Sequence, residues 1–327
     1  MTAETLFRYL LMLVLAVFMA GMIVKVKAMW AGRYGAPLFQ PFFEIIRLFR
    51  KSQVISETSS MVSTLGPTLA LASVLAAAMV VPVGGGAAIM SFKGDFIFFV
   101  YALAAARFFS VIIALDTGGS IGGMGASRVV TFSALIEPAF FIIIASLAQL
   151  TGKNSFTDIY AVILMPDTAN GMATALTGTF VNLAQAWSHS ELLIPAVCGN
   201  IVLMMFILTE AGRLPVCDPA TLSEPAMIHG ALTFNVSGPD LAIMNLTSII
   251  KISLLSTLIT GIIVPAWVSP VTSLFLYIFL MSGIAVTIGL IESLFARLRL
   301  SYVPQFLFGA TGIAIIVLAV LVLGVKK

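Results

Sequence analysis

Charged residues are scarce in this chain of 327 residues. Lys, Arg, Asp and Glu together make up 9% of it, whereas hydrophobic residues make up 60%. A soluble domain carries roughly 25% charged residues, and the mean hydropathy of +1.11 is far above that of such a domain. The composition therefore predicts a polytopic membrane protein. The small net charge of +3 is spread along the chain and argues against nucleic-acid binding.

Cysteine and histidine are also rare. The chain has two cysteines, Cys198 and Cys217, and two histidines, His189 and His229. An iron–sulfur cluster needs about four thiolates, so this chain cannot hold one alone. Because neither C-x-x-C nor H-E-x-x-H spacing is present, we expect no zinc site either.

Motifs for catalysis and nucleotide binding are missing as well. The segment DTGGSIGGMGASR, residues 116–128, is rich in glycine. It lacks the G-x-x-x-x-G-K-S/T pattern of a phosphate-binding loop and follows an apolar segment instead of a strand. We expect it to form a tightly turned loop packed against a partner. The sequence contains no serine nucleophile elbow and no plausible triad, which predicts that the chain performs no bond chemistry itself.

Long apolar segments are what the chain has in abundance. A helix needs about 20 apolar residues to cross the hydrocarbon core of a bilayer. Eight segments qualify: 5–24, 64–83, 95–115, 130–150, 191–211, 241–266, 271–292 and 304–325. We predict an all-α polytopic membrane protein, with about eight transmembrane helices and an amphipathic interfacial helix, in which residues 1–327 form a single membrane domain.

The amphipathic helix is predicted at residues 38–51, LFQPFFEIIRLFRK. At about 100° per residue, one arc of about 120° collects the polar side chains, with Phe43 out of place. These side chains are Gln40, Glu44, Arg47, Arg50 and Lys51. One interpretation is a helix that lies in the membrane interface. The other is a docking surface for a partner on the same basic face, and the two are compatible.

The basic residues predict the orientation of the chain, because Lys and Arg in short loops mark the cytoplasmic side. Ten lie on one predicted side: Lys25, Lys27, Arg33, Arg47, Arg50, Lys51, Arg128, Arg213, Arg297 and Arg299. Five lie on the other: Arg8, Lys93, Lys153, Lys326 and Lys327. This distribution predicts that both termini are outside and that the polar segment from Glu210 to Asp240 is cytoplasmic.

Several ionisable residues fall within or at the ends of the predicted spans: Arg107, Asp116, Glu137, Glu210, Arg213, Lys251 and Glu292. Such residues face a bundle interior or a wet cavity and often serve ion or proton paths. The alternative is a buried ion pair that only fixes helix packing. Glu210 and Arg213 have the i, i+3 spacing of such a pair. Pro138 follows Glu137, and its kink either opens a polar pocket or is a plain packing kink.

Four motifs in order carry a family resemblance. They are VKAMWAGRYGAPLFQPFFEIIRLFRK, LDTGGSIGGMGASR, EAGRLPVCDPATLSEPAMIHGALTFNVSGPD and ESLFARLRLSYVPQF. Together they resemble the eight-helix membrane subunit shared by energy-converting nickel–iron hydrogenases and respiratory complex I. The run Ala36-Pro37-Leu38 after Gly35, the LDTG and the ARLRL sequences are similar to the hydrogenase branch, which includes formate hydrogenlyase and hydrogenase-4.

The resemblance implies a non-catalytic subunit of an oxidoreductase complex in a prokaryotic cytoplasmic (inner) membrane. Such a subunit anchors a cytoplasmic redox arm and helps couple electron transfer to proton or sodium translocation. Its implied partners are an iron–sulfur small subunit and a hydrogenase-like large subunit on the cytoplasmic side, antiporter-like membrane subunits and the lipid bilayer. The chain itself is expected to hold no cofactor. A 4Fe–4S cluster is expected in the partner subunits, where the presence of a nickel–iron centre stays open.

The resemblance and the charges within the spans together nominate two sets of residues. The ion-coupling set is Glu137, Glu210, Arg213, Asp218, Glu224, Asp240 and Lys251. The partner-docking set is Arg33, Gly35, Arg47, Gly125, Ser127 and Arg128. Glu210, Arg213, Pro215 and Asp218 match the E-x-x-R-x-P-x-D stretch of the family. No metal ligand and no catalytic residue is nominated.

The chain departs from the family pattern at three positions. Many relatives carry an acid where this chain has Val129, Gly230 or Asn235. Asn235 can form hydrogen bonds but cannot exchange a proton near neutral pH. A relay here would need water, Asp240 or His229 instead, and we expect His229 to be a solvated interfacial histidine.

Three alternatives stay open beside an ion-coupling anchor. A structural anchor of a related redox complex with degenerate coupling fits the three lost acids. A quinone-reactive complex I subunit is disfavoured by the hydrogenase-type run A-P-L-F-Q-P. A stand-alone secondary transporter often shows internal repeats with broken helices, and no clear repeat is visible in this sequence.

Overall fold

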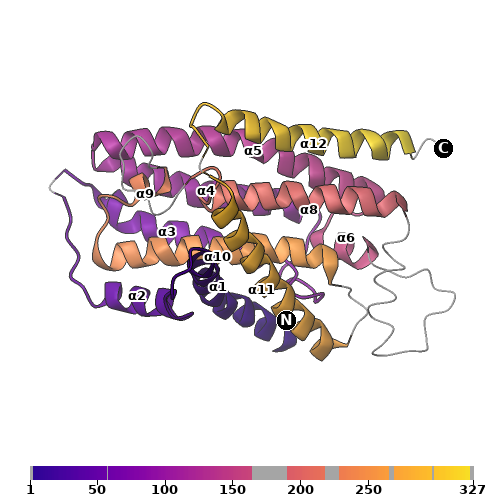
Figure 1. Cartoon of the computed structure of the whole chain (residues 1–327), viewed down its shortest axis with the longest axis horizontal. Coiled ribbons are helices and arrows are strands. Elements are labelled where there is room, and N and C mark those ends of the chain that lie inside the picture. Colours follow the sequence, from indigo (N-terminus) through magenta and orange to yellow (C-terminus); the bar gives the residue numbers. More distant parts are fainter. Residues whose placement is uncertain are drawn as a thin grey trace.

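The computed structural model describes residues 3–56, 58–163, 190–217, 228–264, 269–296 and 298–324. Every regular element in these parts is a helix, and the long helices form one elongated bundle (Figure 1). The long helices are α1 Ala3–Trp30, α3 Met61–Ala78, α4 Asp95–Asp116, α5 Ser120–Thr151, α8 Ser190–Glu210, α10 Gly238–Ile263, α11 Pro270–Leu294 and α12 Val303–Gly324. Three shorter ones are α2 Gln40–Phe49, α6 Phe156–Ile163 and α9 His229–Leu232. The predicted all-α polytopic class is confirmed.

The eight predicted spans correspond to the eight long helices. Seven of these are long and apolar enough to cross a membrane, and in α8 the apolar part with described side chains is Val197–Glu210. The predicted boundaries were too short in two places. α1 continues to Trp30, so Lys25 and Lys27 lie in its last turns and not in a loop. α5 begins at Ser120, ten residues before the predicted start of its span. Basic residues at the end of α1 are favourable because they oppose the negative end of the helix dipole.

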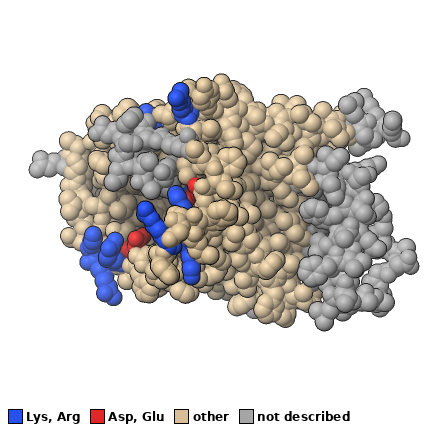
Figure 2. Space-filling view, viewed as in Figure 1, with Lys and Arg blue, Asp and Glu red and all other residues tan. Residues whose placement is uncertain are grey.

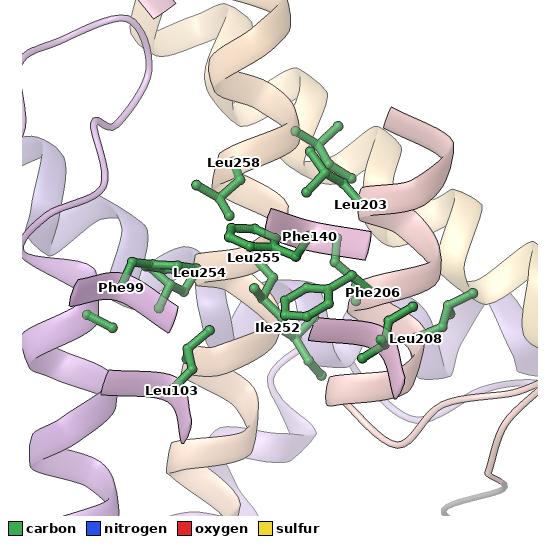
Figure 3. Packing of buried hydrophobic residues seen from close by; sticks show 14 of the residues in the cluster. Phe99, Leu103, Phe140, Leu203, Phe206, Leu208, Ile252, Leu254, Leu255 and Leu258 are labelled. Atoms are coloured by element: carbon green, nitrogen blue, oxygen red, sulfur yellow. The ribbon is translucent and has the colours of Figure 1, made fainter. Parts of the chain in front are cut away.

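Helix α10 is the centre of the bundle. In its most apolar window, 72% of the residues are buried, against 22–50% in the other candidate spans. Leu254, Leu255 and Leu258 of α10 meet aromatic rings of α4, α5 and α8 (Figure 3). The rings of Phe140 and Phe206 have centroids 4.9 Å apart. Because lipid tails are as apolar as leucine, close contact of this kind stabilises the bundle in place of removal from water.

Small polar side chains of α10 are fully buried and bonded. Ser253 Oγ donates to the carbonyl of Met12 over 3.1 Å, and the hydroxyls of Thr257 and Tyr277 lie 3.0 Å apart. The Tyr160 hydroxyl of α6 donates to the Leu258 carbonyl over 3.2 Å. Since no water is available inside a bilayer, these bonds make the polar groups compatible with burial. Helix α6 lies in the 151–190 gap, where the sequence predicted no span.

The glycine-rich segment is helical, so its prediction as a loop was wrong. Only Thr117–Gly119 separates α4 from α5, and Gly118 has the positive φ of +67° that such a turn favours. Gly122 and Gly125 lie inside α5, where a methyl group would overlap Ala114 and Ala231 respectively. Glycine costs a helix about 1 kcal/mol per residue. Close packing of α5 on α4 and α9 outweighs that cost.

Asp116 at the end of α4 closes the start of α3. Its carboxylate accepts hydrogen bonds from Ser60 N (2.8 Å), Ser60 Oγ (2.7 Å) and Ser63 Oγ (2.6 Å). The first backbone N–H groups of a helix lack partners within the helix, and Asp116 supplies one across the chain. This ionisable residue at a span end is therefore a structural cap.

The predicted amphipathic helix is present as α2, and it lies along the first part of α10 (Figure 1). Before α2, the Leu38 carbonyl rests on Gly21 inside α1. After α2, Ser52 rests on Gly238, the first residue of α10, and Gln53 donates a hydrogen bond to Asp240. Helix α2 therefore runs from within the bundle towards the end where α10 begins. Its placement at the membrane interface stays a prediction.

Candidate functional site

Four charged side chains from four helices meet inside the bundle. Arg107 of α4 lies 2.6 Å from Glu137 Oε1 of α5 through Nη1, and 3.1 Å from Glu210 Oε1 of α8 through Nη2. Lys251 Nζ of α10 lies 3.3 Å from Glu210 Oε2. We call Arg107, Glu137, Glu210 and Lys251 the four-charge cluster. With two cations and two anions, it is electrically neutral when all four are ionised.

The cluster is buried unevenly. The side chain of Glu210 is 1% exposed, those of Arg107 and Lys251 are 11% and 12% exposed, and that of Glu137 is 25% exposed. A charge in this position needs counter-ions, because its transfer out of water is costly. The structure thus brings together three of the residues nominated from the sequence and adds Arg107. The opposite signs of these charges within the spans were the signal that pointed to Arg107.

A cavity of about 60 Å³ lies beside the cluster. Besides Arg107, Glu210 and Lys251, its lining includes polar side chains of His229, Thr247 and Ser248 and the apolar side chain of Val129. A water molecule needs roughly 10–15 Å³ of such space and two to four polar partners, so the cavity has room for several. Glu210 Oε1 touches Arg107 without hydrogen-bond geometry, and His229 Nδ1 is buried without a partner. Both atoms can bond to water there.

His229 is packed into the protein, so its prediction as a solvated residue was wrong. Its ring lies against Gly212, whose φ of +59° turns the chain back after α8. Burial, and next the positive charge of Lys251, lower the pKa of His229 to about 4, although Glu210 opposes them. The imidazole beside the cavity is therefore neutral at pH 7.

The predicted i, i+3 pair of Glu210 and Arg213 does not form. Helix α8 ends at Glu210, and the turn at Gly212 directs Arg213 elsewhere. Arg213 Nη1 lies 3.1 Å from Glu292 Oε1 of α11, and Lys27 Nζ of α1 lies 3.6 Å from Glu292 Oε2. The ion-pair spacing rule holds only inside a continuous helix. Arg213 belongs to a second cluster, which joins the ends of α1, α8 and α11.

Asp240 lies in a hydrogen-bonded seam apart from the four-charge cluster. It accepts from Gln53, and Ser237 Oγ donates to the Val54 carbonyl over 2.8 Å. Asn235 Nδ2 donates to Thr117 Oγ1 over 2.9 Å. These bonds join the segment after α2 to the start of α10 and to the α4–α5 turn. Asp218 and Glu224 lie outside the described residues.

The nominated docking residues differ in exposure. Arg33, Arg47 and Ser127 are exposed, whereas Gly125 is buried against α9 and serves packing there. Gly35 and Arg128 are half-buried. On the face drawn in Figure 2, the visible Lys and Arg side chains gather towards the end of the molecule that carries α2 and α9. Among the described residues, no group of three or more His, Cys, Asp or Glu could hold a metal ion.

Comparison with known families decides the relationship. The NADH dehydrogenase family model matches residues 4–323, which is nearly the whole chain. The chain belongs to the NADH dehydrogenase family. This confirms the resemblance that the four motifs indicated.

Three relatives of this NADH dehydrogenase family member are similar in sequence. Hydrogenase-4 component C of Escherichia coli (strain K12) is 28% identical over 255 residues, which cover 78% of this chain and 73% of the relative. Formate hydrogenlyase subunit 4 of the same strain is 26% identical over 317 residues, which cover 94% and 95%. A membrane-complex relative from Polaromonas naphthalenivorans (strain CJ2), a component of NADH-quinone oxidoreductase, is 25% identical over 286 residues, which cover 84% and 74%.

A solved structure shares the fold of this family member. A chain of the membrane-bound sulfane sulfur reductase, an archaeal respiratory membrane complex, superposes with a TM-score of 0.76. The match covers 97% of this chain and 99% of the other, at 19% sequence identity. At that identity the likeness establishes the helical architecture alone.

Proposed function

We propose that this chain is a non-catalytic membrane subunit that anchors a cytoplasmic redox arm and couples electron transfer to ion movement. The relatives named hydrogenase-4 component C and formate hydrogenlyase subunit 4 support a place in a complex of that kind. The arm's iron–sulfur small subunit, its hydrogenase-like large subunit and antiporter-like membrane neighbours are part of the proposal. In it, a 4Fe–4S cluster belongs to the partner subunits.

The observation that carries the coupling role is the four-charge cluster beside a polar cavity. Glu137 and Glu210 share Arg107, so a change in the charge of one carboxylate alters the balance around the other. Electrostatic interactions of this kind are strong in a low-dielectric interior. A redox event at the arm can therefore be passed on as a shift in the protonation of these acids.

The same contacts favour protons over sodium as the coupled ion. Both carboxylates already face cationic side chains at distances of 2.6 to 3.3 Å. A sodium ion placed there would be repelled by Arg107 and Lys251. A proton, in contrast, can pass between a carboxylate, cavity water and neighbouring hydroxyl groups. Glu137 is the more exposed of the two acids and serves as the point of exchange.

The test is ion pumping by the intact complex with altered cluster residues. Glu137→Gln removes the exposed acid. The double variant Glu210→Gln with Lys251→Gln removes the buried acid while the cluster stays neutral. Glu44→Gln, at an exposed acid of α2, is the matched control. We expect retained electron transfer and subunit assembly in all three, with pumping lost in the two cluster variants. Normal pumping in both cluster variants would refute the coupling role.

A structural anchor with degenerate coupling is the second candidate, and one observation favours it. Val129 lines the cavity with an apolar side chain, and Gly230 places no side chain near it. If the wild-type complex turns over without forming any ion gradient, this candidate replaces the first. Co-purification of the redox subunits with the chain would still be expected in that case.

A further inference from the structure

Helix α2 carries a gradient of side chains along its axis. Its first turn contains Phe42 and Phe43, which are 48% and 59% exposed. Its end contains Arg47 and is followed by Arg50 and Lys51, all three exposed. Phe49, also 48% exposed, lies near this basic end. The helix has 10 residues and is about 15 Å long at the usual rise of an α-helix.

The packing of α2 orients this gradient. The Leu38 carbonyl, just before the helix, rests on Gly21, which lies well inside the candidate span Glu4–Trp30. Ser52, just after the helix, rests on Gly238, where the span of α10 begins. The exposed phenylalanines therefore lie at the depth of membrane spans. The basic residues lie at the level where the spans end.

We propose that α2 binds an anionic phospholipid, with the acyl chains along Phe42 and Phe43 and the headgroup phosphate at Arg50 and Lys51. An apolar surface at the depth of the spans meets hydrocarbon, and basic residues at their ends attract anionic headgroups. Within the part of the chain that the structure describes, Arg50 and Lys51 form no ion pair. Glu44 is the single acid on the helix, and it lies away from this end.

A lipid fits the surface better than a protein partner does. A cytoplasmic subunit would contact the basic end alone and would leave Phe42 and Phe43 uncovered at the depth of the spans. A phospholipid matches both halves, because its own polarity changes along the same direction. The site is independent of the four-charge cluster, which lies inside the bundle, and its test involves no measurement of ion pumping.

The test uses delipidated, purified protein and two lipids with identical acyl chains, phosphatidylglycerol and phosphatidylcholine. Native mass spectrometry counts the bound lipids, and a titration gives the apparent affinity. The variant is Arg50→Gln with Lys51→Gln. The matched control is Lys93→Gln with Lys153→Gln, a pair of exposed basic residues on loops at the opposite end of the bundle. A further variant, Phe43→Ala, tests the acyl-chain contact without changing charge.

We expect wild-type protein and the control pair to prefer phosphatidylglycerol. The Arg50/Lys51 variant should bind it about thirtyfold more weakly, since each basic residue near an anionic surface contributes about fivefold. Phe43→Ala should weaken both lipids alike. Equal binding of the two lipids by wild-type protein, or equal losses in the test and control pairs, would overturn the site. Loss of a protein subunit with lipid binding intact would assign the surface to a protein partner instead.

Discussion

Glu210 shows how a single side chain can be both buried and charged in a membrane protein. It is 1% exposed and has Arg107 at 3.1 Å and Lys251 at 3.3 Å. Removal of one partner from a buried ion pair leaves an uncompensated charge, whereas removal of a matched pair does not. The stability of the cluster therefore depends on its charge balance more than on any one contact.

This balance predicts the effect of neutralising Glu210. Glu210→Gln leaves two cations facing one carboxylate and should destabilise the protein by roughly 3–5 kcal/mol. Glu210→Gln combined with Lys251→Gln should recover most of that loss. Thermal unfolding in one detergent, with both variants side by side, measures the difference. A double variant no more stable than the single one would contradict the idea.

His229 predicts a pH dependence. Its pKa is about 4 in the folded protein and about 6.5 when unfolded, so the unfolded chain binds the extra proton between these values. Its contribution to stability is complete above pH 6.5 and is lost as the pH falls towards 4. The melting temperature of wild-type protein should therefore fall more between pH 7 and 5 than that of His229→Gln. Parallel pH profiles would show that His229 does not titrate in this way.

At the scale of elements, small residues decide how closely the helices approach. Gly125 of α5 lies against Ala231 of α9, and the same short helix carries His229. Gly122 allows the start of α5 to fold against the end of α4. In membranes, close packing of this kind takes the role that removal of apolar surface from water has in soluble proteins.

Two neighbouring glycines of α5 provide a controlled test. Gly125→Val should push α9 away and lower the melting temperature, because its side chain would overlap Ala231. Gly123→Ala should be neutral or raise stability by up to about 1 kcal/mol, since nothing lies within 4 Å and alanine favours the helix. Thermal unfolding of the two variants separates packing from helix propensity. Equal destabilisation of both would argue against the α5–α9 contact.

At the scale of the whole molecule, the charge distribution predicts a sidedness. Lys51 precedes α3 and Lys153 follows α5, so three membrane spans separate them and they lie on opposite sides. The positive-inside rule places Lys51 in the cytoplasm.

Cysteine labelling checks this orientation. Lys51→Cys should react with a membrane-impermeant thiol reagent in inverted vesicles and be protected in intact cells, and Lys153→Cys should show the reverse. Both substitutions are made in a parent with Cys198 and Cys217 replaced, so that the parent itself gives no signal. Labelling of both positions from the same side would rule out the predicted topology.

Sequence alone determined the class of this protein, the approximate position of its eight spans and its family, because apolar length and ordered motifs are local properties of the chain. It also indicated Glu137, Glu210 and Lys251, since charge within a span is conspicuous. Only the tertiary structure decided their partners. The joining of Glu210 to Arg107, the turn of Arg213 towards Glu292 and the burial of His229 each depend on helices far apart in sequence. The helical state of residues 120–128 did too, because glycine propensity is weak and packing across the bundle outweighs it.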